Sequence, residues 1–253
     1  SPAFNLYGYN DRSEVIDSKR YLGTDIEDTS SPVSAQDYKY AYDPIGNRDS
    51  YQVAQGTATI YTTNNLNQYT ATVNPAESFS FDADGNLTQD GTYDYTWNGE
   101  NRLIAVETSD PTDGDPKAEF TYDSMGRRVR KMSYAWDAAN TEWDLVADHV
   151  YVYDGWNVVL VLDNADSDAT FKTFTWGLDL SLTLQGAGGV GGLLSCDDAA
   201  DGDIYYYLYD ANGNVGQLLD SSGNTDAHYE YEPFGGQIVA SGTYAMHNEF
   251  RFS

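Results

Sequence analysis

Four aspartates lie close together in the last quarter of the chain. They are Asp197, Asp198, Asp201 and Asp203, within the run CDDAADGD at 196–203. Ca²⁺ takes six to eight oxygen ligands from carboxylates and carbonyls in a flexible loop, so this run is the best candidate for a calcium site. It lacks the closing glutamate of an EF-hand loop, so we favour a solvated acidic loop and keep calcium binding as the alternative.

Other residues with chemical potential do not form a recognisable site. The run GAGGVG at 186–191 matches a dinucleotide-binding pattern, but neither a helix nor a βαβ frame follows it, which favours close packing of glycine backbone. The three histidines are scattered without metal-ligand spacing, and Ser195 and Cys196 have no nearby histidine. The sequence therefore predicts no catalytic centre, no enzyme activity and no cofactor beyond the calcium candidate.

The charge balance restricts the partners. Among 253 residues, 13 Lys and Arg stand against 40 Asp and Glu, a formal net charge of −27. A surface of that sign repels phosphate backbones and anionic lipids, so we expect no nucleic-acid binding. The apolar run at 177–195 contains Asp179 and many glycines, so we predict buried or close-packed β structure there and no membrane insertion. Because the first residue is Ser, we expect a processed or internal piece of a larger protein.

Short aromatic runs separated by turn residues determine the predicted fold class. The runs YKYAY (38–42), HVYVY (149–153) and IYYYLY (204–209) alternate large and smaller or polar residues, the period of a half-buried strand. Segments with helical periodicity are hard to find. The sequence therefore predicts an all-β protein.

One turn signature recurs between these runs: an aromatic residue, Asp, two variable residues, then Gly. Asp accepts hydrogen bonds from the backbone two residues on, and Gly adopts the positive φ that closes the turn. Each copy is thus predicted to be a β-hairpin tip. The signature residues are Tyr42, Asp43 and Gly46; Asp82 and Gly85; Tyr122, Asp123 and Gly126; and Tyr209, Asp210 and Gly213.

Weaker copies fill the gaps, for example at 9–15, 61–69, 95–103 and 231–235. Repeats of this kind bury their apolar face only by stacking on neighbouring repeats, so we predict one continuous array over residues 1–253. Acidic insertions at 110–119, 163–169 and 196–203 are expected to form exposed loops.

The repeated motifs resemble the YD repeats of Rhs proteins, and the array is similar to the YD shell of teneurins. The segments 93–106, 120–131 and 207–236 carry the resemblance, and residues 207–253 look like the start of the Rhs-associated core region that follows repeats 1–206. The resemblance implies a spiralling sheet of β-hairpins or part of a hollow β shell. It also implies an aspartyl autoprotease with DPxG motifs further along such chains. We interpret DPIG at 43–46 as a hairpin turn instead, because Pro fits the second turn position.

By this resemblance the chain would be a non-catalytic shell or scaffold segment of a larger bacterial protein, secreted or displayed on the cell surface. The expected partners are other YD repeats of the parent protein or further copies of the chain, meeting at sheet edges. Two alternatives stay open: part of a shell that encloses the effector of a polymorphic toxin, and a carbohydrate- or cell-binding module. An aromatic groove open to solvent would favour the binding module, because stacking on sugars needs exposed rings.

Overall fold

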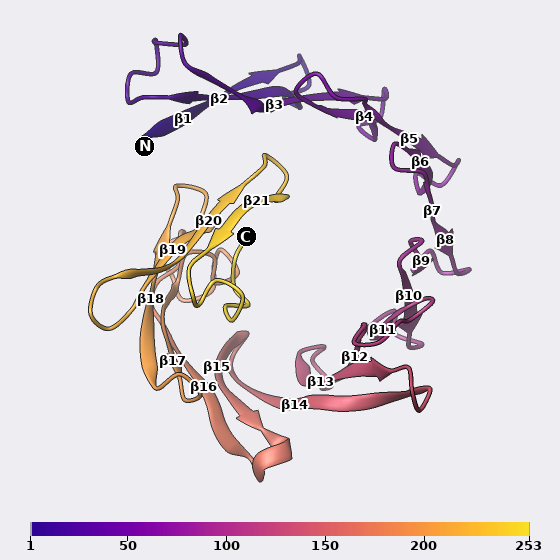
Figure 1. The fold of residues 1–253 in the computed structure, drawn as a ribbon, viewed down its shortest axis with the longest axis vertical. Helices are drawn as coiled ribbons and strands as arrows, with labels where there is room; N and C mark the ends of the chain where they lie inside the picture. Colours follow the sequence, from indigo (N-terminus) through magenta and orange to yellow (C-terminus); the bar gives the residue numbers. More distant parts are fainter. Residues whose placement is uncertain (1, 253) are drawn as a thin grey trace. The chain divides into compact units, whose positions relative to one another are not determined.

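The computed structural model describes residues 2–252 and is built almost entirely of antiparallel β-strands (Figure 1). The all-β prediction is therefore confirmed. The one helical element among the described residues is the short 3₁₀ helix η1 (Asn164–Asp166). The chain divides into two compact units, the first ending at Trp97 and the second beginning at Asn98. Within residues 2–252, no helix has the length and apolar character needed to cross a membrane.

In the first unit each strand pairs with the strand before or after it in the sequence, but β7 and β8 belong to different sheets. Strands β1 to β7 form one sheet in chain order, and β8, β9 and β10 pair in the same way. The bounds are β1 (Ala3–Tyr9), β2 (Val15–Leu22), β3 (Pro32–Tyr42), β4 (Arg48–Val53), β5 (Thr59–Thr63), β6 (Tyr69–Val73), β7 (Glu77–Ser78), β8 (Ser80–Phe81), β9 (Leu87–Gln89) and β10 (Tyr93–Trp97).

The second unit continues the same up-and-down pattern, with β11 to β21 antiparallel and in chain order. All connections are therefore local turns or loops. The bounds are β11 (Leu103–Thr108), β12 (Pro116–Tyr122), β13 (Arg128–Asp137), β14 (Glu142–Asp154), β15 (Asn157–Asp163), β16 (Ala169–Trp176), β17 (Leu193–Asp198), β18 (Asp203–Tyr209), β19 (Val215–Leu219), β20 (Thr225–Tyr231) and β21 (Gln237–Ser241).

Strand β18 shows why the alternating runs fold as strands. Successive side chains of a strand point to opposite faces of the sheet. Tyr205 and Tyr207 are accordingly buried, whereas Tyr206 between them is 46% exposed. The alternation in the sequence is therefore an alternation between a packed face and a solvated face.

The recurrent signature forms one kind of five-residue turn, which we call the signature turn. At 43–47 the N–H of Asp43 donates to the carbonyl of Asn47, and the N–H of Gly46 donates to the carbonyl of Asp43. The strand register shifts by one residue at Tyr42, immediately before the turn. The same backbone pairing occurs in the turns that begin at Asn10, Asn64, Asp82, Asn98, Asp123, Asp210, Asp220 and Glu232.

The fourth position of this turn requires a positive φ. Gly46, Gly85, Gly126 and Gly213 have φ values of 98°, 89°, 84° and 87°. In the weaker copies Ser13, Asn67 and Asn101 occupy the same position with φ values of 62°, 61° and 57°. Asn tolerates this conformation better than most residues with a side chain. The weaker copies therefore keep the turn although they have lost its glycine.

The prediction of buried or close-packed β structure over 177–195 is wrong for most of the segment. Residues 177–192 form a loop of consecutive turns, and β17 begins only at Leu193. The Asp179 carboxylate accepts hydrogen bonds from the backbone N–H groups of Ala187 and Gly189, so the loop folds back around this side chain. The leucines of the loop are exposed, Leu182 by 80%.

The acidic insertions form loops, but the loops are shorter than expected. The turns cover 109–115, 164–168 and 199–202, and the flanking residues of each insertion belong to strands. Charged insertions are tolerated at these sites because the backbone there is solvated.

The turn geometry predicts how glycine replacements will affect stability. A Cβ added at Gly85 would meet only Gln68 Nε2, at 3.4 Å, so the positive φ is the main obstacle to a side chain. We expect Gly85→Ala to lower the free energy of unfolding by about 1 kcal/mol, and Gly85→Asn to cost less. Gly99→Ala is the matched control, because Gly99 lies in a signature turn without positive φ and in open space. Equal urea midpoints for Gly85→Ala and Gly99→Ala would contradict the assignment.

Candidate functional site: the contacts between hairpins and the C-terminal segment

A hydrogen bond links one hairpin to the next at the signature turns. The Tyr122 hydroxyl, at the end of β12, donates to the carbonyl of Leu103 at 2.7 Å. Leu103 is the first residue after the preceding signature turn. Antiparallel neighbours run in opposite directions, so the end of β12 lies beside the beginning of β11. The bond therefore joins the turn after β12 to the preceding hairpin.

The same bond recurs with the aromatic side chain that precedes a turn as the donor. Tyrosine donates through its hydroxyl and tryptophan through its indole N–H, so either residue type serves. We call this set of bonds the aromatic ladder. Its other members are Tyr42 to Val15 (2.8 Å), Trp97 to Leu87 (2.7 Å), Tyr153 to Arg128 (2.8 Å), Trp176 to Val158 (2.7 Å), Tyr209 to Leu193 (2.5 Å) and Tyr231 to Val215 (2.9 Å).

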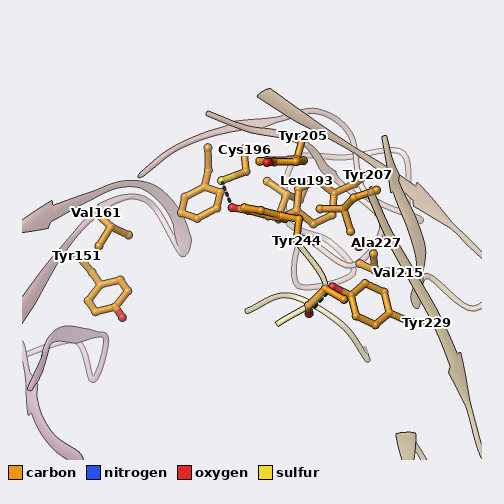
Figure 2. Packing of buried hydrophobic residues seen from close by; sticks show 13 residues of the cluster. Tyr151, Val161, Leu193, Cys196, Tyr205, Tyr207, Val215, Ala227, Tyr229 and Tyr244 are labelled. Atoms are coloured by element: carbon orange, nitrogen blue, oxygen red, sulfur yellow. Dashed lines mark hydrogen bonds between the residues drawn. The ribbon is translucent and has the colours of Figure 1, made fainter. Parts of the chain in front are cut away.

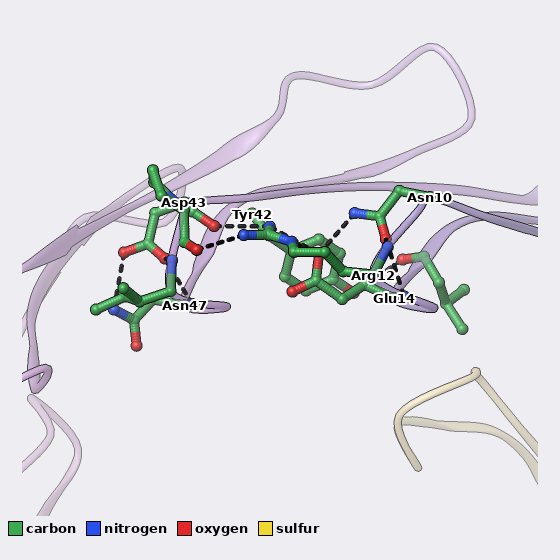
Figure 3. A network of polar contacts seen from close by, with 9 residues as sticks. Asn10, Arg12, Glu14, Tyr42, Asp43 and Asn47 are labelled. Atoms are coloured by element: carbon green, nitrogen blue, oxygen red, sulfur yellow. Dashed lines mark hydrogen bonds and ion pairs between the residues drawn. The ribbon is translucent and has the colours of Figure 1, made fainter.

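Arginines in the turns add a second connection. Arg12 donates from its guanidinium to the carbonyls of Asp43 and Pro44, at 2.8 and 2.5 Å, as Figure 3 shows beside the Asn10 turn. Arg102 and Arg127 make the equivalent contact to the next turn, reaching the carbonyls of Asp123 (2.9 Å) and Gly155 (2.7 Å). A guanidinium is a rigid multiple donor. The carbonyls of Asp43 and Asp123 accept it in addition to the N–H groups of Gly46 and Gly126, because a carbonyl oxygen has two lone pairs.

The carboxylates of the signature turns are occupied by hydrogen bonds. Asp82 accepts the backbone N–H groups of Asp84 and Asn86 and the side-chain amide of Asn86, all at 2.9 Å. The Asn86 side chain contributes most to holding the pKa of Asp82 below its usual value, and the backbone N–H groups add to it. Asp220 has a lowered pKa for the same reason, with Asn224 as the partner. A carboxylate committed in this way is a structural acceptor and a poor general base.

In the second unit, residues 242–252 cross the packed face of the sheet, and we call them the C-terminal segment. Tyr244 is 1% exposed, and its ring stacks on that of Tyr205 with a centroid separation of 3.5 Å. Figure 2 shows the Tyr244 hydroxyl directed toward Cys196. Burial raises the pKa of the Cys196 thiol to about 11, so this cysteine is not an activated nucleophile.

A buried ion pair holds the same segment. Lys172 Nζ lies 3.2 Å from Asp198 Oδ2 and donates to the carbonyl of His247 at 2.7 Å. Tyr244 donates its hydroxyl to the same Asp198 oxygen at 2.7 Å. Although burial opposes ionisation, the hydrogen bond from Tyr244 and the charge of Lys172 together lower the pKa of Asp198. A buried pair is tolerated when further hydrogen bonds satisfy it, as they do here.

Three further contacts continue along the C-terminal segment. Tyr207 donates to the side-chain oxygen of Asn248 at 2.8 Å, and Tyr229 donates to the carbonyl of Ala245 at 2.8 Å. The N–H of Val215 donates to the carbonyl of Arg251 at 2.8 Å. The predicted core-like region at 207–253 thus contributes both strands and the segment that covers them.

The four aspartates that the sequence offered as weak calcium candidates have different partners and do not converge on one point. Asp198 is buried in the pair with Lys172, Asp201 accepts the hydroxyl of Tyr205, and Asp203 accepts the backbone N–H of Ile204. Asp197 lies on the opposite face of β17 from Asp198. Within residues 2–252 no group of three His, Cys, Asp or Glu residues could hold a metal ion.

Sequence reasoning missed the role of the signature tyrosines as ladder donors. A signal was available: Tyr or Trp, and not Phe, precedes most of the turns (Tyr42, Trp97, Tyr122, Tyr153, Trp176, Tyr209, Tyr231). What these residues share is a donor at the far end of the ring. The C-terminal segment gave no such signal.

Comparisons with known proteins identify curated relatives in Bacillus. No family model matches the chain. It is 33% identical over 199 residues to the tRNA3(Ser)-specific nuclease WapA of Bacillus spizizenii, and 30% identical over 199 residues to the tRNA nuclease WapA of Bacillus subtilis strain 168. Each match covers 78% of this chain, and the chain spans 7% of the length of either relative.

Solved structures with similar coordinates include a Photorhabdus luminescens Tc holotoxin pore and the TcdB2–TccC3 complex. They are 18% and 16% identical, with TM-scores of 0.41 in both cases. The matches cover 98% of this chain and 15% and 16% of the solved chains. The Bacillus relatives are consistent with the Rhs-type resemblance of the sequence motifs.

The aromatic ladder predicts a measurable contribution from single hydroxyl groups. We expect Tyr122→Phe to lower the free energy of unfolding by about 1 kcal/mol, because the carbonyl of Leu103 loses its donor while the ring still packs. Tyr206→Phe is the matched control, since this exposed tyrosine belongs to no ladder bond. Urea unfolding of the two variants beside the parent chain tests the ladder. The ladder is refuted if Tyr122→Phe and Tyr206→Phe change the free energy of unfolding by the same amount.

The lowered pKa values of the turn aspartates predict a pH dependence. Their contribution to stability is complete above the unfolded-state pKa of about 4 and is lost as pH falls through the lower folded-state pKa. Asp82→Asn should reduce this loss of stability at low pH, because asparagine has no carboxyl group to protonate. Asn64 shows that asparagine can begin a turn of the same geometry. Asp84→Asn, in the same turn, is the control. Urea midpoints from pH 7 to pH 3 should converge for Asp82→Asn and the parent chain at low pH. Parallel curves would refute the prediction.

Proposed function

We propose that the chain is a non-catalytic structural segment of a larger Rhs-type protein, in which it forms part of a shell or scaffold. The aromatic ladder carries this proposal. It recurs between Val15 and Tyr231, except at the turns after Thr63 and Phe81, and ties most hairpins to their predecessors, so these polar side chains serve the array itself. An array whose units are joined mainly to their neighbours can be lengthened by adding further repeats of the same kind, as a shell wall requires.

The lack of a catalytic centre is supported by the state of the groups that could form one. Asp43, in the DPxG sequence, accepts the N–H groups of Ile45 and Asn47 and the Asn47 amide. Cys196 is buried with a raised thiol pKa, and Asp198 is bound to Lys172 and Tyr244. Groups held in this way are poorly placed to act as a general base or a nucleophile.

The relatives favour a structural role for this segment in a protein whose nuclease activity lies elsewhere in its sequence. Two of them are named as tRNA nucleases, and this chain corresponds to 7% of their length. We propose that a parent protein of this kind carries any effector in its remaining sequence, with the present segment in the surrounding shell. We propose that such a parent protein is secreted or displayed on the bacterial surface.

The proposal of a non-catalytic segment is tested with tRNA and with the chain itself. We expect purified chain incubated with bulk tRNA and Mg²⁺ to leave the RNA intact, and to show no self-cleavage over days. Ribonuclease A is the positive control for the RNA. The proposal would be overturned by a tRNA-cleaving activity that co-purifies with the chain, or by self-cleavage that Asp43→Asn abolishes.

Sheet edges provide the proposed route to partners. Strands β1 (Ala3–Tyr9) and β21 (Gln237–Ser241) each pair with one neighbour among the described residues. An unpaired edge is a template for another strand, either from further repeats of the parent protein or from a second copy. The charge of −27 opposes association between copies, and salt screens that repulsion.

Light scattering from dilute to concentrated protein, at low and at high salt, tests this association. We expect monomers at low salt and concentration-dependent growth at about 1 M salt. Leu6→Lys, in the exposed edge of β1, should reduce the growth, because charge on an edge strand blocks pairing. Ile45→Lys, at an exposed turn away from the edge, is the control. A monomer under every condition would contradict the proposed partners.

A further inference from the structure

A groove on the first unit is lined by side chains from strands β5, β6, β8 and β9, from the turn at 64–68 and from Phe79. Its volume is about 400 Å³, within the range of small-molecule sites. Most of the lining surface is apolar. The lining residues are Tyr61, Asn67, Gln68, Tyr69, Phe79, Phe81 and Leu87.

The groove lies where the aromatic ladder is interrupted. The residue before the turn at 64–68 is Thr63, and the residue before the turn at 82–86 is Phe81, which has no hydroxyl to donate. Strands β7 and β8 are two residues each, with Phe79 between them. This part of the array therefore has too few side chains to close over the rings, and the groove stays open.

The walls of the groove are flat and uncharged. Tyr61 and Tyr69 lie 5.1 Å apart between ring centroids with their planes inclined at 53°, so they present two faces. Arg48 lies 5.9 Å from the ring centroid of Tyr61 and does not line the groove. No charged side chain is part of the lining. The site therefore offers aromatic faces without an ion to pair with a charged ligand.

The rim supplies neutral hydrogen-bonding groups. Gln68 Oε1 accepts the side-chain amide of Asn64 at 2.8 Å, and this bond orients the Gln68 amide. Its Nε2 and the Tyr61 hydroxyl make no side-chain hydrogen bond within residues 2–252, so both are available to a ligand. Asn67 is exposed beside them. Amide and phenol groups both donate and accept, as recognition of hydroxyl groups requires.

We propose that this groove binds an uncharged saccharide. The C–H face of a sugar ring packs on the electron-rich face of an aromatic ring, while its hydroxyl groups bond to amides at the rim. An apolar peptide would need no flat walls, and aliphatic side chains would line its site equally well. An anionic glycan would meet the field of a chain with a charge of −27 and no cation in the lining. This inference is independent of the scaffold role and goes beyond it.

The test is titration calorimetry of the full chain with neutral tetrasaccharides: chitotetraose, cellotetraose and maltotetraose. A heparin-derived tetrasaccharide is the anionic comparison, and a fluorescent apolar dye reports non-specific apolar surface. Tyr61→Leu and Phe79→Leu keep an apolar side chain in the groove and remove the flat ring. Tyr206→Leu, at an exposed tyrosine on β18 in the second unit, is the matched control. Thermal unfolding confirms that each variant is folded.

We expect at least one neutral tetrasaccharide to bind with a dissociation constant below about 1 mM, a range typical of small open sites. Tyr61→Leu and Phe79→Leu should weaken it tenfold or more, and Tyr206→Leu should leave it unchanged. Absence of binding by all three neutral probes would overturn the inference. So would equal binding by the leucine variants, since an apolar occupant would explain it better, or tighter binding of the anionic probe.

Discussion

Most of the structure depends on one hydrogen bond: an aromatic side chain before a turn donates to the carbonyl just after the preceding turn. A two-stranded hairpin alone is marginal in water, because each has one face without a partner. The bond from Tyr122 to Leu103 and its equivalents give a backbone carbonyl a side-chain donor and link the ring to the neighbouring hairpin. Packing and polar satisfaction are thus obtained from one side chain in each repeat.

This constraint explains part of the composition. Five of the 22 tyrosines and two of the five tryptophans are ladder donors, because this position requires a ring with a donor at its far end. It also explains where the regular pattern fails. Thr63 and Phe81 stand before turns but provide no aromatic side chain with a donor. The rings of Tyr61, Tyr69 and Phe79 nearby line an open groove. In the second unit the packed face is instead covered by the C-terminal segment, whose Tyr244 stacks on Tyr205.

The acidic character of the chain has two different origins. Aspartates such as Asp82 close turns through backbone N–H groups, and Asp198 balances Lys172 beneath the C-terminal segment. The remaining carboxylates lie both in strands, as Asp94 does, and in loops, as Asp113 does, and they contribute to the net charge of −27. In the proposed scaffold role, repulsion of that kind would oppose pairing between the exposed strand edges of separate copies. Among the described residues, no three His, Cys, Asp or Glu side chains are grouped so that they could hold a metal ion.

The sequence by itself determined the strands and the turns, because both depend on neighbours a few residues away. Alternation in 204–209 fixed the buried face of β18, and the Asp-to-Gly spacing at 43–46 and 82–85 fixed the hairpin tips. Only the tertiary structure decided the partners of Asp198 and Tyr244, which lie 46 residues apart, and the open groove at Tyr61 and Phe79. It also decided that 177–192 is a loop, since the capture of backbone N–H groups by Asp179 leaves no trace in periodicity. Contacts between distant segments depend on which faces the packed sheet brings together, and local pattern carries no record of that.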